Sequence, residues 1–301
     1  MKIAVLMSTY NGEAYLQEQI ESVLAQQGDF EISLCVRDDG STDGTQNLLE
    51  KAAQQGKLQW YKGKNLKPAK SFLDLVDHFP GYDFYAFCDQ DDYWHADKLQ
   101  KSLDLLLRET GPAMAFANAR LVDKDLQSLG RNVYRHCPQL DFYSLVCSGG
   151  ILGCTIVFNE ALARILRQCA KPDKLIMHDF YAAVLCALMD GRILYDPEPH
   201  MDYRQHGSNV VGAQWSKLGA LKERFAWVTR PEPVSISEMA QSILDQDLSI
   251  PDEGKKKWLK TVASYRRNFL SALSLACSTK PRYNSRNMAI TMRLAILLRN
   301  R

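Results

Sequence analysis

Three carboxylates follow directly on an apolar run near residue 90. Residues 84–88 are apolar or aromatic and predict a buried strand, and Asp89, Asp91 and Asp92 fall within four positions at its end. Like charges this close repel one another unless a cation or strong hydrogen-bond donors lie between them. The pattern indicates a divalent metal site that holds an anionic group such as a diphosphate. The alternative is a solvated acidic turn that caps a helix beginning near His95.

Two earlier predicted strands also end in polar residues. Ser8-Thr9-Tyr10-Asn11 follows the first strand, and Asp38-Asp39-Gly40-Ser41 follows the second. Because the carboxyl ends of parallel strands meet at one edge of a sheet, these motifs and the three carboxylates are predicted to converge. Each motif taken alone also suits a helix N-cap and turn.

Convergence would give individual side chains distinct tasks. An Asp after the second strand could accept hydrogen bonds from a nucleobase or a ribose, while Asp91 and Asp92 hold the metal and the diphosphate. Lys67 and Lys70 would balance further phosphate charge, although Lys67 equally suits a solvated helix start.

The elements that position these residues alternate between strand and helix, which is typical of an α/β fold. Beyond residue 109 the pattern is mixed, and after Gly212 it is helical to the end, with interruptions at 231–233, Pro251 and 280–281. We therefore predict one domain over residues 1–212 and a helical C-terminal region over 213–301. The predicted strands are 3–7, 31–36, 58–61, 82–88, 113–121, 153–158 and 192–195, with 197–204 extended; the predicted helices are 13–26, 45–53, 69–77, 96–108, 160–169 and 178–189.

The composition is that of an ordinary globular protein. The chain has 301 residues, 46% of them hydrophobic and 24% charged. No signal peptide is visible, and no apolar stretch approaches the roughly 20 residues of a membrane-spanning helix. The eight cysteines are scattered without CxxC pairs, which predicts reduced thiols in a cytoplasmic protein and neither a disulfide framework nor a zinc site.

Charge is distributed unevenly along the chain. The formal net charge is +2, yet the segment from Gly254 to Arg301 carries twelve Lys or Arg and no Asp or Glu. A basic tail on an acidic body indicates contact with an anionic surface. Apolar residues recur at helical spacing in the tail, where a helix–helix seam and a basic helix resting on anionic lipid are equally good interpretations. Nucleic acid is the rival partner, but no binding module supports it, and we expect none. The apolar residues of the tail stripe are Met288, Met292, Ala295 and Ile296, accompanied by Arg282, Arg286, Arg293, Arg299 and Arg301; a similar stripe comprises Trp215, Leu218, Leu221, Phe225 and Val228.

The three strand-end motifs in their order and spacing resemble the successive signatures of family 2 glycosyltransferases. The resemblance covers residues 1 to about 210. It implies an inverting enzyme with the GT-A nucleotide-sugar fold, which is a Rossmann-like mixed sheet flanked by helices. The motifs that carry it are Ser8-Thr9-Tyr10-Asn11, Asp38-Asp39-Gly40-Ser41-Thr42-Asp43 and Asp89-Gln90-Asp91-Asp92.

Motifs in the second half resemble one subgroup of that family. Its members are often rhamnosyltransferases that build bacterial cell-surface polysaccharide such as O-antigen or capsule. The subgroup more often has Trp where this chain has Phe180, a change that leaves the chemistry untouched. The motifs are Ser148-Gly149-Gly150, Met177-His178-Asp179-Phe180 and Tyr203-Arg204-Gln205-His206-Gly207-Ser208-Asn209.

The resemblance implies a role for each candidate residue. An inverting transfer needs one general base, which the resemblance places at Asp179; the alternative is that His178-Asp179 merely caps a helix. Residues 203–209 equally suit a surface loop, and Gly149-Gly150 a flexible turn. The implied nucleotide- and donor-binding residues are Thr9, Tyr10, Asn11, Asp39, Lys70, Asp89, Asp91, Gly149, Gly150 and Arg204; Asp91, Asp92 and His206 are the implied ligands of Mg²⁺ or Mn²⁺.

The expected activity is metal-dependent inverting transfer of a hexose or deoxyhexose to a saccharide acceptor that is lipid-linked. The subgroup favours dTDP-rhamnose as donor, and UDP-sugars carrying glucose, galactose or N-acetylhexosamine stay open. The expected location is the inner face of the cell membrane, on its cytoplasmic side. One rival is a nucleotidyltransferase, which normally has a Gly- and Arg/Lys-rich loop after the first strand, unlike Tyr10-Asn11-Gly12-Glu13. The other is a non-catalytic saccharide-binding protein, against which the intact carboxylates argue.

Overall fold

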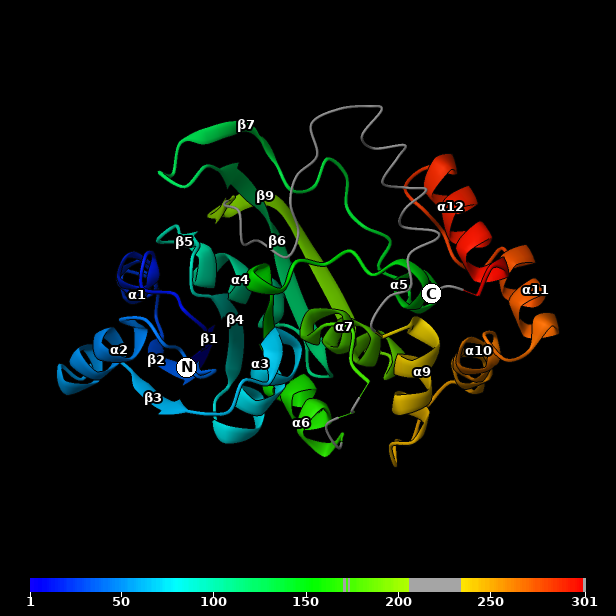
Figure 1. Cartoon of the computed structure of the whole chain (residues 1–301), viewed down its shortest axis with the longest axis horizontal. Coiled ribbons are helices and arrows are strands. Elements are labelled where there is room, and N and C mark those ends of the chain that lie inside the picture. The colour runs from blue at the N-terminus through cyan, green and yellow to red at the C-terminus, as the bar shows by residue number, and fades with distance from the viewer. Residues whose placement is uncertain (170–171, 173, 206–233, 300–301) are drawn as a thin grey trace.

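The computed structural model describes residues 1–169, 172, 174–205 and 234–299. The predicted metal ligand His206, the apolar stripe from Trp215 to Val228 and the predicted boundary near residue 212 lie outside the described residues. A nine-stranded sheet runs through the described part (Figure 1), in the order β3-β2-β1-β4-β8-β6-β9-β5, with β7 paired to β6. It mixes parallel and antiparallel neighbours, so the expected mixed α/β sheet is confirmed.

Four parallel strands form the N-terminal half of the sheet: β1 (Lys2–Thr9), β2 (Glu31–Asp38), β3 (Gln59–Lys62) and β4 (Phe84–Asp89). The central ones are continuous apolar runs because both of their faces are buried. In β1, Ile3 and Val5 pack on one face while Ala4 and Leu6 pack on the other. Ser8 is in register with both Arg37 and Asp89, so the three predicted motifs do meet at one edge.

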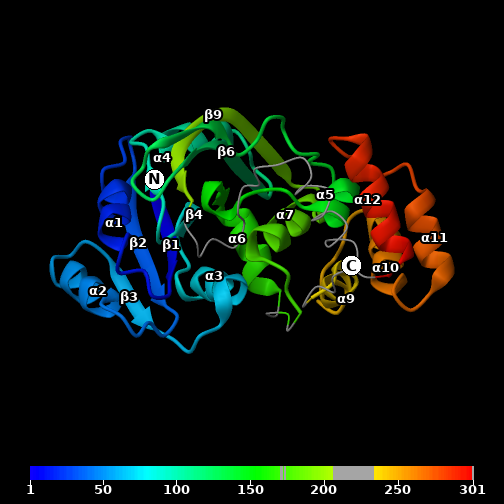
Figure 2. The same ribbon diagram turned by 45° about the horizontal axis from the view of Figure 1, so that its top comes forward.

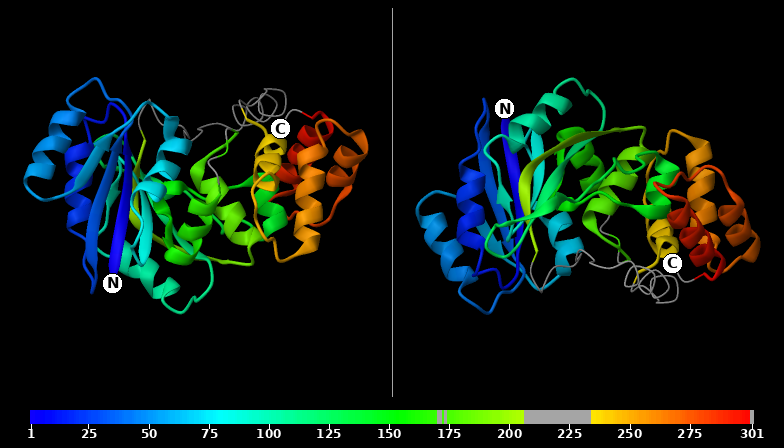
Figure 3. Two further views of the ribbon diagram at one scale, coloured as in Figure 1. Left: turned by 90° about the horizontal axis from the view of Figure 1, so that it is seen from below. Right: turned by 90° about the horizontal axis from the view of Figure 1, so that it is seen from above.

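Helices cover both faces of this half (Figures 1 and 3). The helices α1 (Leu16–Leu24), α2 (Thr45–Gln54) and α4 (Lys98–Leu106) contribute to one core cluster. The opposite face packs against α3 (Lys67–His78), α6 (Glu160–Gln168) and α7 (His178–Leu188). All six helices were predicted, with ends displaced by a few residues.

The second half of the sheet brings distant segments to the site. β8 (Val157–Asn159) lies antiparallel to β4, and β6 (Ala113–Val122) lies between β8 and β9 (Arg192–Arg204). The two predicted segments 192–195 and 197–204 form this single long strand, because a register shift after Ala117 accommodates its prolines. The short elements β5 (Tyr93–Trp94), β7 (Ser128–Asn132), α5 (Phe142–Ser148) and the 3₁₀ turn η1 (Gly153–Thr155) were not predicted.

The C-terminal region is helical, as predicted, and lies at the end of the molecule opposite α2 (Figure 2). It comprises α9 (Ile236–Leu244), α10 (Glu253–Ser264), α11 (Phe269–Cys277) and α12 (Arg286–Leu297). The predicted interruptions at Pro251 and at 280–281 separate helices, and the break between α10 and α11 was missed. Its buried side chains join the same core cluster as α3 and α7. In the described part of the chain, no helix is both long and apolar enough to cross a membrane.

Candidate functional site

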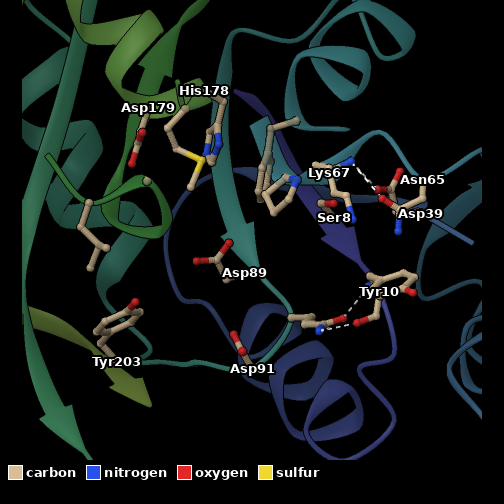
Figure 4. A pocket seen from close by; sticks show the side chains of 16 residues that line it. Ser8, Tyr10, Asp39, Asn65, Lys67, Asp89, Asp91, His178, Asp179 and Tyr203 are labelled. Carbon is tan, nitrogen blue, oxygen red and sulfur yellow. Dashed lines mark hydrogen bonds between the residues drawn. The ribbon is translucent and has the colours of Figure 1, made fainter. Parts of the chain in front are cut away.

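A cavity of about 280 Å³ opens at the carboxyl ends of β1, β2 and β4 (Figure 4). It receives side chains from both halves of the chain, because β9 and the start of α7 close it from the far side. The residues that line it are Ser8, Tyr10, Asp39, Asn65, Lys67, Pro68, Phe72, Asp89, Gln90, Asp91, Leu152, Gly153, Met177, His178, Asp179 and Tyr203. We call this the first cavity.

The three acids after β4 occupy different positions. Asp89 and Asp91 line the first cavity, whereas Asp92 is fully buried beneath it. This differs from the expected arrangement, in which Asp91 and Asp92 together hold the metal and the diphosphate. Oδ1 of Asp92 accepts a hydrogen bond of 3.2 Å from the backbone N–H of Arg204, and Oδ2 has no hydrogen-bond partner among the described residues.

The same acids form a site that suits a divalent cation. Carboxylate oxygens of Asp89 and Asp92 and the Sγ of Cys154 lie within 4.8 Å of one another. Burial, and then repulsion from Asp91, raises the pKa of Asp89 to about 7; the pKa of Asp92 is also raised, for the same reasons. A cation would relieve both effects and satisfy the unpartnered Oδ2, so the residues fit Mg²⁺ or Mn²⁺. A carboxylate-rich site is therefore present, and Cys154 is a neighbour that the sequence patterns did not predict.

A buried lysine, also missed from the sequence, lies behind these acids. Lys98 begins α4, is 1% exposed, and has its Nζ 3.9 Å from the centroid of the Trp94 ring. Burial lowers its pKa to about 8, opposed by the nearby charge of Asp92. Its ammonium group offsets part of the negative charge of the cluster when it is protonated.

Arg204 fixes the acidic loop and does not line the first cavity. The residue is 2% exposed, and its Nε donates to the carbonyl of Asp91 at 2.8 Å. Its guanidinium also donates to the carbonyl of Lys124 and pairs with Glu18. This geometry therefore does not support the expected direct contact between Arg204 and a nucleotide-sugar. The side chain instead positions the loop that carries Asp91 and Asp92.

Asp39 connects the end of β2 to the start of α3. Its carboxylate lines the first cavity and accepts hydrogen bonds from the backbone N–H groups of Leu66 and Lys67, at 2.8 and 2.9 Å. It also forms a buried ion pair with Arg37. Lys67 lines the cavity and Lys70 does not, so the structure favours the lysine that the sequence interpretation ranked lower.

The motif after β1 divides into cavity-lining and structural residues. Tyr10 is 48% exposed at the cavity, and Gln90 holds its backbone through two hydrogen bonds of 2.9 and 3.1 Å (Figure 4). Thr9 is buried and donates to Asp38 at 3.2 Å, and Asn11, with a φ of 50°, accepts from the backbone of Thr42 at 2.9 Å. Thr9 and Asn11 therefore shape the loops on which Tyr10 and Asp39 stand.

Asp179 lies in the first turn of α7 and faces the first cavity from the side opposite Asp39 (Figure 4). Its Oδ1 accepts a hydrogen bond of 2.6 Å from the backbone N–H of Phe180. Burial raises the pKa of Asp179 to about 6, although that bond and one from the backbone of Gly153 favour the charged form. The carboxylate is thus ionised at neutral pH and basic enough to take up a proton.

The neighbouring histidine is buried and neutral. His178 stacks on Phe72 at a ring-centroid distance of 4.0 Å and meets Phe87 edge-on at 4.7 Å. Burial lowers its pKa to about 3, and neither ring nitrogen has a hydrogen-bond partner in the described part of the chain. Gly153 keeps a space open beside it: a Cβ there would lie 2.7 Å from the Nε2 of His178 and 3.2 Å from the Oδ2 of Asp179. The absence of a side chain at position 153 therefore lets both groups keep these positions.

A second cavity of about 500 Å³ adjoins the first one on the side of the C-terminal helices. Both cavities are lined by Leu152, Met177 and Asp179. The second cavity contains Gly149 and Gly150, which were expected at the donor site and do not line the first cavity. Its other lining residues are Val133, Tyr134, Cys147, Ser148, Ile151, Ile176, Phe180, Val234, Ser235, Ile236 and Met292.

Comparison with known proteins agrees with this geometry. A family model described as "Glycosyl transferase family 2" matches residues 4–171, which is more than half of the chain. The chain belongs to glycosyl transferase family 2. The sequence-based assignment to this family is confirmed, and the chain is a glycosyltransferase.

Relatives of this family 2 chain include enzymes of polysaccharide synthesis. A dTDP-rhamnosyl transferase RfbG from Shigella flexneri is 26% identical, over 89% of this chain and 92% of that protein. The glucosyltransferase WfgD from Escherichia coli, which acts on GlcNAc-diphosphoundecaprenol, is 28% identical over 53% of this chain and 61% of that protein. These matches indicate a family 2 enzyme of polysaccharide synthesis.

Solved structures confirm the GT-A fold. The structure of Staphylococcus aureus TarS aligns with a TM-score of 0.56 at 18% identity, over 93% of this chain and 76% of that one. A mannosyltransferase from Pyrobaculum calidifontis, in complex with GDP-Man and Mn²⁺, aligns with a TM-score of 0.52 at 16% identity, over 99% of this chain and 85% of that one. The family match ends before Asp179 and before the residues of the second cavity from Ile176 onward, whereas Val133 to Leu152 of that cavity lie within it.

Proposed function

We propose that the protein transfers a sugar from a nucleotide-sugar to a saccharide acceptor with inversion at the transferred carbon. The observation that carries this proposal is the position of Asp179, which lines both cavities. One cavity has the carboxylates that suit a metal and a diphosphate, and the other is largely apolar. A base at the junction of the two cavities can take the proton of an acceptor hydroxyl in one cavity while the sugar is held in the other.

The first cavity is proposed to bind the donor. The exposed ring of Tyr10 offers a surface on which a nucleobase can stack, and Asp39 lies beside it to accept hydrogen bonds from the base or the ribose. Lys67 is placed to meet phosphate charge. Asp89 and Asp92 would hold Mg²⁺ or Mn²⁺, which would neutralise charge on a leaving diphosphate, and Asp91 lines the cavity beside them. A further contribution of His206 stays a prediction.

The transfer itself needs a single displacement. A carboxylate oxygen of Asp179 removes the proton of an acceptor hydroxyl while that oxygen forms a bond to the anomeric carbon of the sugar. The bond from this carbon to the diphosphate breaks on the opposite side, and the nucleoside diphosphate leaves with the electron pair. The raised pKa of Asp179, about 6, suits a base that works near neutral pH.

The second cavity is proposed to bind the acceptor. None of its described lining residues is Lys or Arg, and most of them are apolar. Such a lining suits an uncharged sugar that presents an apolar face, with any phosphate of a lipid carrier held outside the cavity. We propose rhamnose as the transferred sugar because RfbG, a dTDP-rhamnosyl transferase, matches over most of both chains. We also propose a lipid-linked acceptor of the O-antigen or capsule type, because WfgD acts on a diphosphoundecaprenol substrate.

Replacing Asp179 by Asn tests the proposed base. The transfer rate should fall by about 10²- to 10⁴-fold, the usual contribution of general base catalysis, while nucleotide-sugar binding is retained. Thermal shift with dTDP-rhamnose and with UDP-sugars, each with and without Mn²⁺, measures that binding and compares the donors. Retained transfer by the variant would refute the base, and stabilisation by no nucleotide-sugar would refute the donor cavity.

A further inference from the structure

Large apolar side chains are exposed together on the last two helices that the structure describes. Elsewhere in the described residues, such side chains are exposed singly, as with Leu24 and Leu107. Single exposed apolar residues are normal on a soluble protein, whereas a contiguous group marks an interaction site. The group consists of Phe269, Leu270, Leu273, Met288, Ile290, Leu294, Leu297 and Leu298, which we call the α11–α12 face.

Helix α12 is apolar on two sides. Met292, Ala295 and Ile296 of the predicted stripe point inward and are buried, as in a helix–helix seam, whereas Met288 is exposed. Ile290, Leu294 and Leu297 recur at helical spacing on the outer side and are exposed. The inner side of α12 therefore packs into the hydrophobic core. The outer side is exposed in the described part of the chain.

The exposed side chains of the two helices form one surface. The start of α11 lies beside the end of α12, because Nε of Arg266 donates to the carbonyl of Arg299 at 3.1 Å. The guanidinium carbon of Arg299 lies 5.6 Å from the ring centroid of Phe269. Figures 1 and 2 show both helices at the outer end of the molecule. Leu270, next to Phe269, is 72% exposed, and Leu298, next to Arg299, is also exposed.

Charge identifies the partner of this surface. Arg286 and Arg293 are exposed at the same helical spacing as Ile290 and Leu297, and no Asp or Glu occurs between Gly254 and Arg301. A second copy of the chain would bring arginines against arginines across a two-fold axis, which is unfavourable. A surface with negative charge and an apolar interior matches both properties, and a phospholipid bilayer has them.

We propose that the α11–α12 face docks on anionic phospholipid, with its leucines at the boundary of headgroups and acyl chains. Arg286 and Arg293 then lie among the lipid phosphates. The same helix contributes Met292 to the second cavity from its inner side. Because a helix with its side chains is only about 10–12 Å across, the acceptor cavity lies close to the docked membrane. This placement deepens the proposed function for a lipid-linked acceptor, but lipid docking can be measured without catalysis.

Vesicle sedimentation tests the proposal with the full chain. The protein should sediment with vesicles of phosphatidylcholine and phosphatidylglycerol, and should be released by salt. The double variant Leu270→Glu/Leu294→Glu should bind at least about tenfold more weakly, and Arg286→Glu/Arg293→Glu should do the same. Matched controls lie at the end of α4, where Leu107→Glu and Arg108→Glu alter an exposed leucine and an exposed arginine far from this face.

Four outcomes of these vesicle and solution measurements would overturn the proposal, and a fifth comes from a comparison with nucleic acid. They are absence of binding to anionic vesicles, equal binding to phosphatidylcholine alone, equal loss in the α4 controls, and a dimer in solution that Leu270→Glu/Leu294→Glu dissociates. Binding to single-stranded nucleic acid that exceeds vesicle binding would also overturn it. Thermal shift with nucleotide-sugar, which the variants should leave unchanged, separates failure of this proposal from failure of the donor site.

Discussion

The backbone N–H of Arg204 donates to Oδ1 of Asp92 over 3.2 Å, which joins the last residue of β9 to the acidic loop after β4. Residues that are 112 positions apart thus determine where the acids after β4 stand. The side chain of Arg204 strengthens this link through Asp91, Lys124 and Glu18. The position of the acidic loop therefore depends on the second half of the sheet.

Arg204→Met should weaken both the fold and the binding of metal and nucleotide. The variant leaves the carbonyls of Asp91 and Lys124 without their donor, at a cost of about 2–4 kcal/mol in the free energy of unfolding. Urea denaturation and titration with Mn²⁺ and nucleotide measure the two effects. Arg120→Met is the matched control, since Arg120 is largely exposed and its pair with Asp202 should contribute less than about 1 kcal/mol. Equal effects of the two variants would contradict the positioning role.

Gly153→Ala should stop transfer without stopping donor binding. The added methyl group would lie 2.7 Å from Nε2 of His178 and 3.2 Å from Oδ2 of Asp179, so these two side chains would have to shift from their positions. We expect the transfer rate to fall by at least about 100-fold, because a displacement of about 1 Å near the reacting atoms has that effect. Gly111→Ala is the control, since a Cβ there meets nothing within 4 Å. Normal turnover by Gly153→Ala would show that transfer does not depend on the positions of these two side chains.

His178→Phe should stabilise the protein while reducing activity. Phenylalanine can keep the stacking on Phe72 and removes two buried nitrogens that have no partner among the described residues. The free energy of unfolding should rise by about 1–3 kcal/mol, the desolvation cost of an unsatisfied polar group. Thermal denaturation and the transfer rate are the measurements. A loss of stability would show that the histidine is satisfied by a partner in the free protein.

Protonation of Asp179 should control the acidic limb of the rate profile. The base works only when ionised, so kcat/KM should decline as the pH falls through about 6, the pKa to which burial raises this group. The free energy of unfolding changes in the opposite direction to the rate as the pH falls. Because the pKa of Asp179 is higher in the folded state than in the unfolded state, protonation of this group stabilises the fold. Asp179→Asn should therefore be more stable than the native protein above pH 6, by up to about 3 kcal/mol, and the gap should close as the pH falls toward 4. A gap that does not depend on pH would contradict the assigned pKa.

Mn²⁺ should raise the melting temperature of the native protein, because it relieves repulsion among the acids after β4. Asp89→Asn should melt higher than the native protein without metal, since one crowded charge is gone, and should gain little when Mn²⁺ is added. Asp125→Asn alters an exposed Asp outside this cluster and should respond like the native protein. If the two variants respond alike, the metal site is not at Asp89.

Sequence patterns predicted which strand-end motifs meet at one edge of the sheet, for a physical reason. Parallel strands buried on both faces appear as apolar runs, and polar residues directly after them must lie at one sheet edge. Asp39 and Asp89 could therefore be placed together without a structure. Even there, local pattern did not determine which of the three acids faces the cavity, because that depends on the link from Arg204.

The residues missed are those whose surroundings come from distant parts of the chain. Lys98 looks like an ordinary surface residue of a helix, and it is buried because Trp94 belongs to a two-residue strand that pairs with Met201. Cys154 lies near the acids because it belongs to a 3₁₀ turn, and the spacing of apolar residues in the sequence does not predict that turn. Gly149 and Gly150 were assigned to the donor, but α5 and α7 direct them to the second cavity. Such contacts are set by tertiary packing and cannot be inferred from local spacing.

The two-sided character of α12 has a consequence for how such enzymes could diversify. One helix supplies Met292 to the second cavity and Ile290, Leu294 and Leu297 to the outer surface. A chimaera that exchanged residues 234–299 with those of a relative would replace one wall of the second cavity and the whole outer face in one step, while leaving the acids after β4 and the ends of β1 and β2 intact. The choice of acceptor and the surface on which the enzyme acts would then be inherited together, independently of the sugar that is transferred.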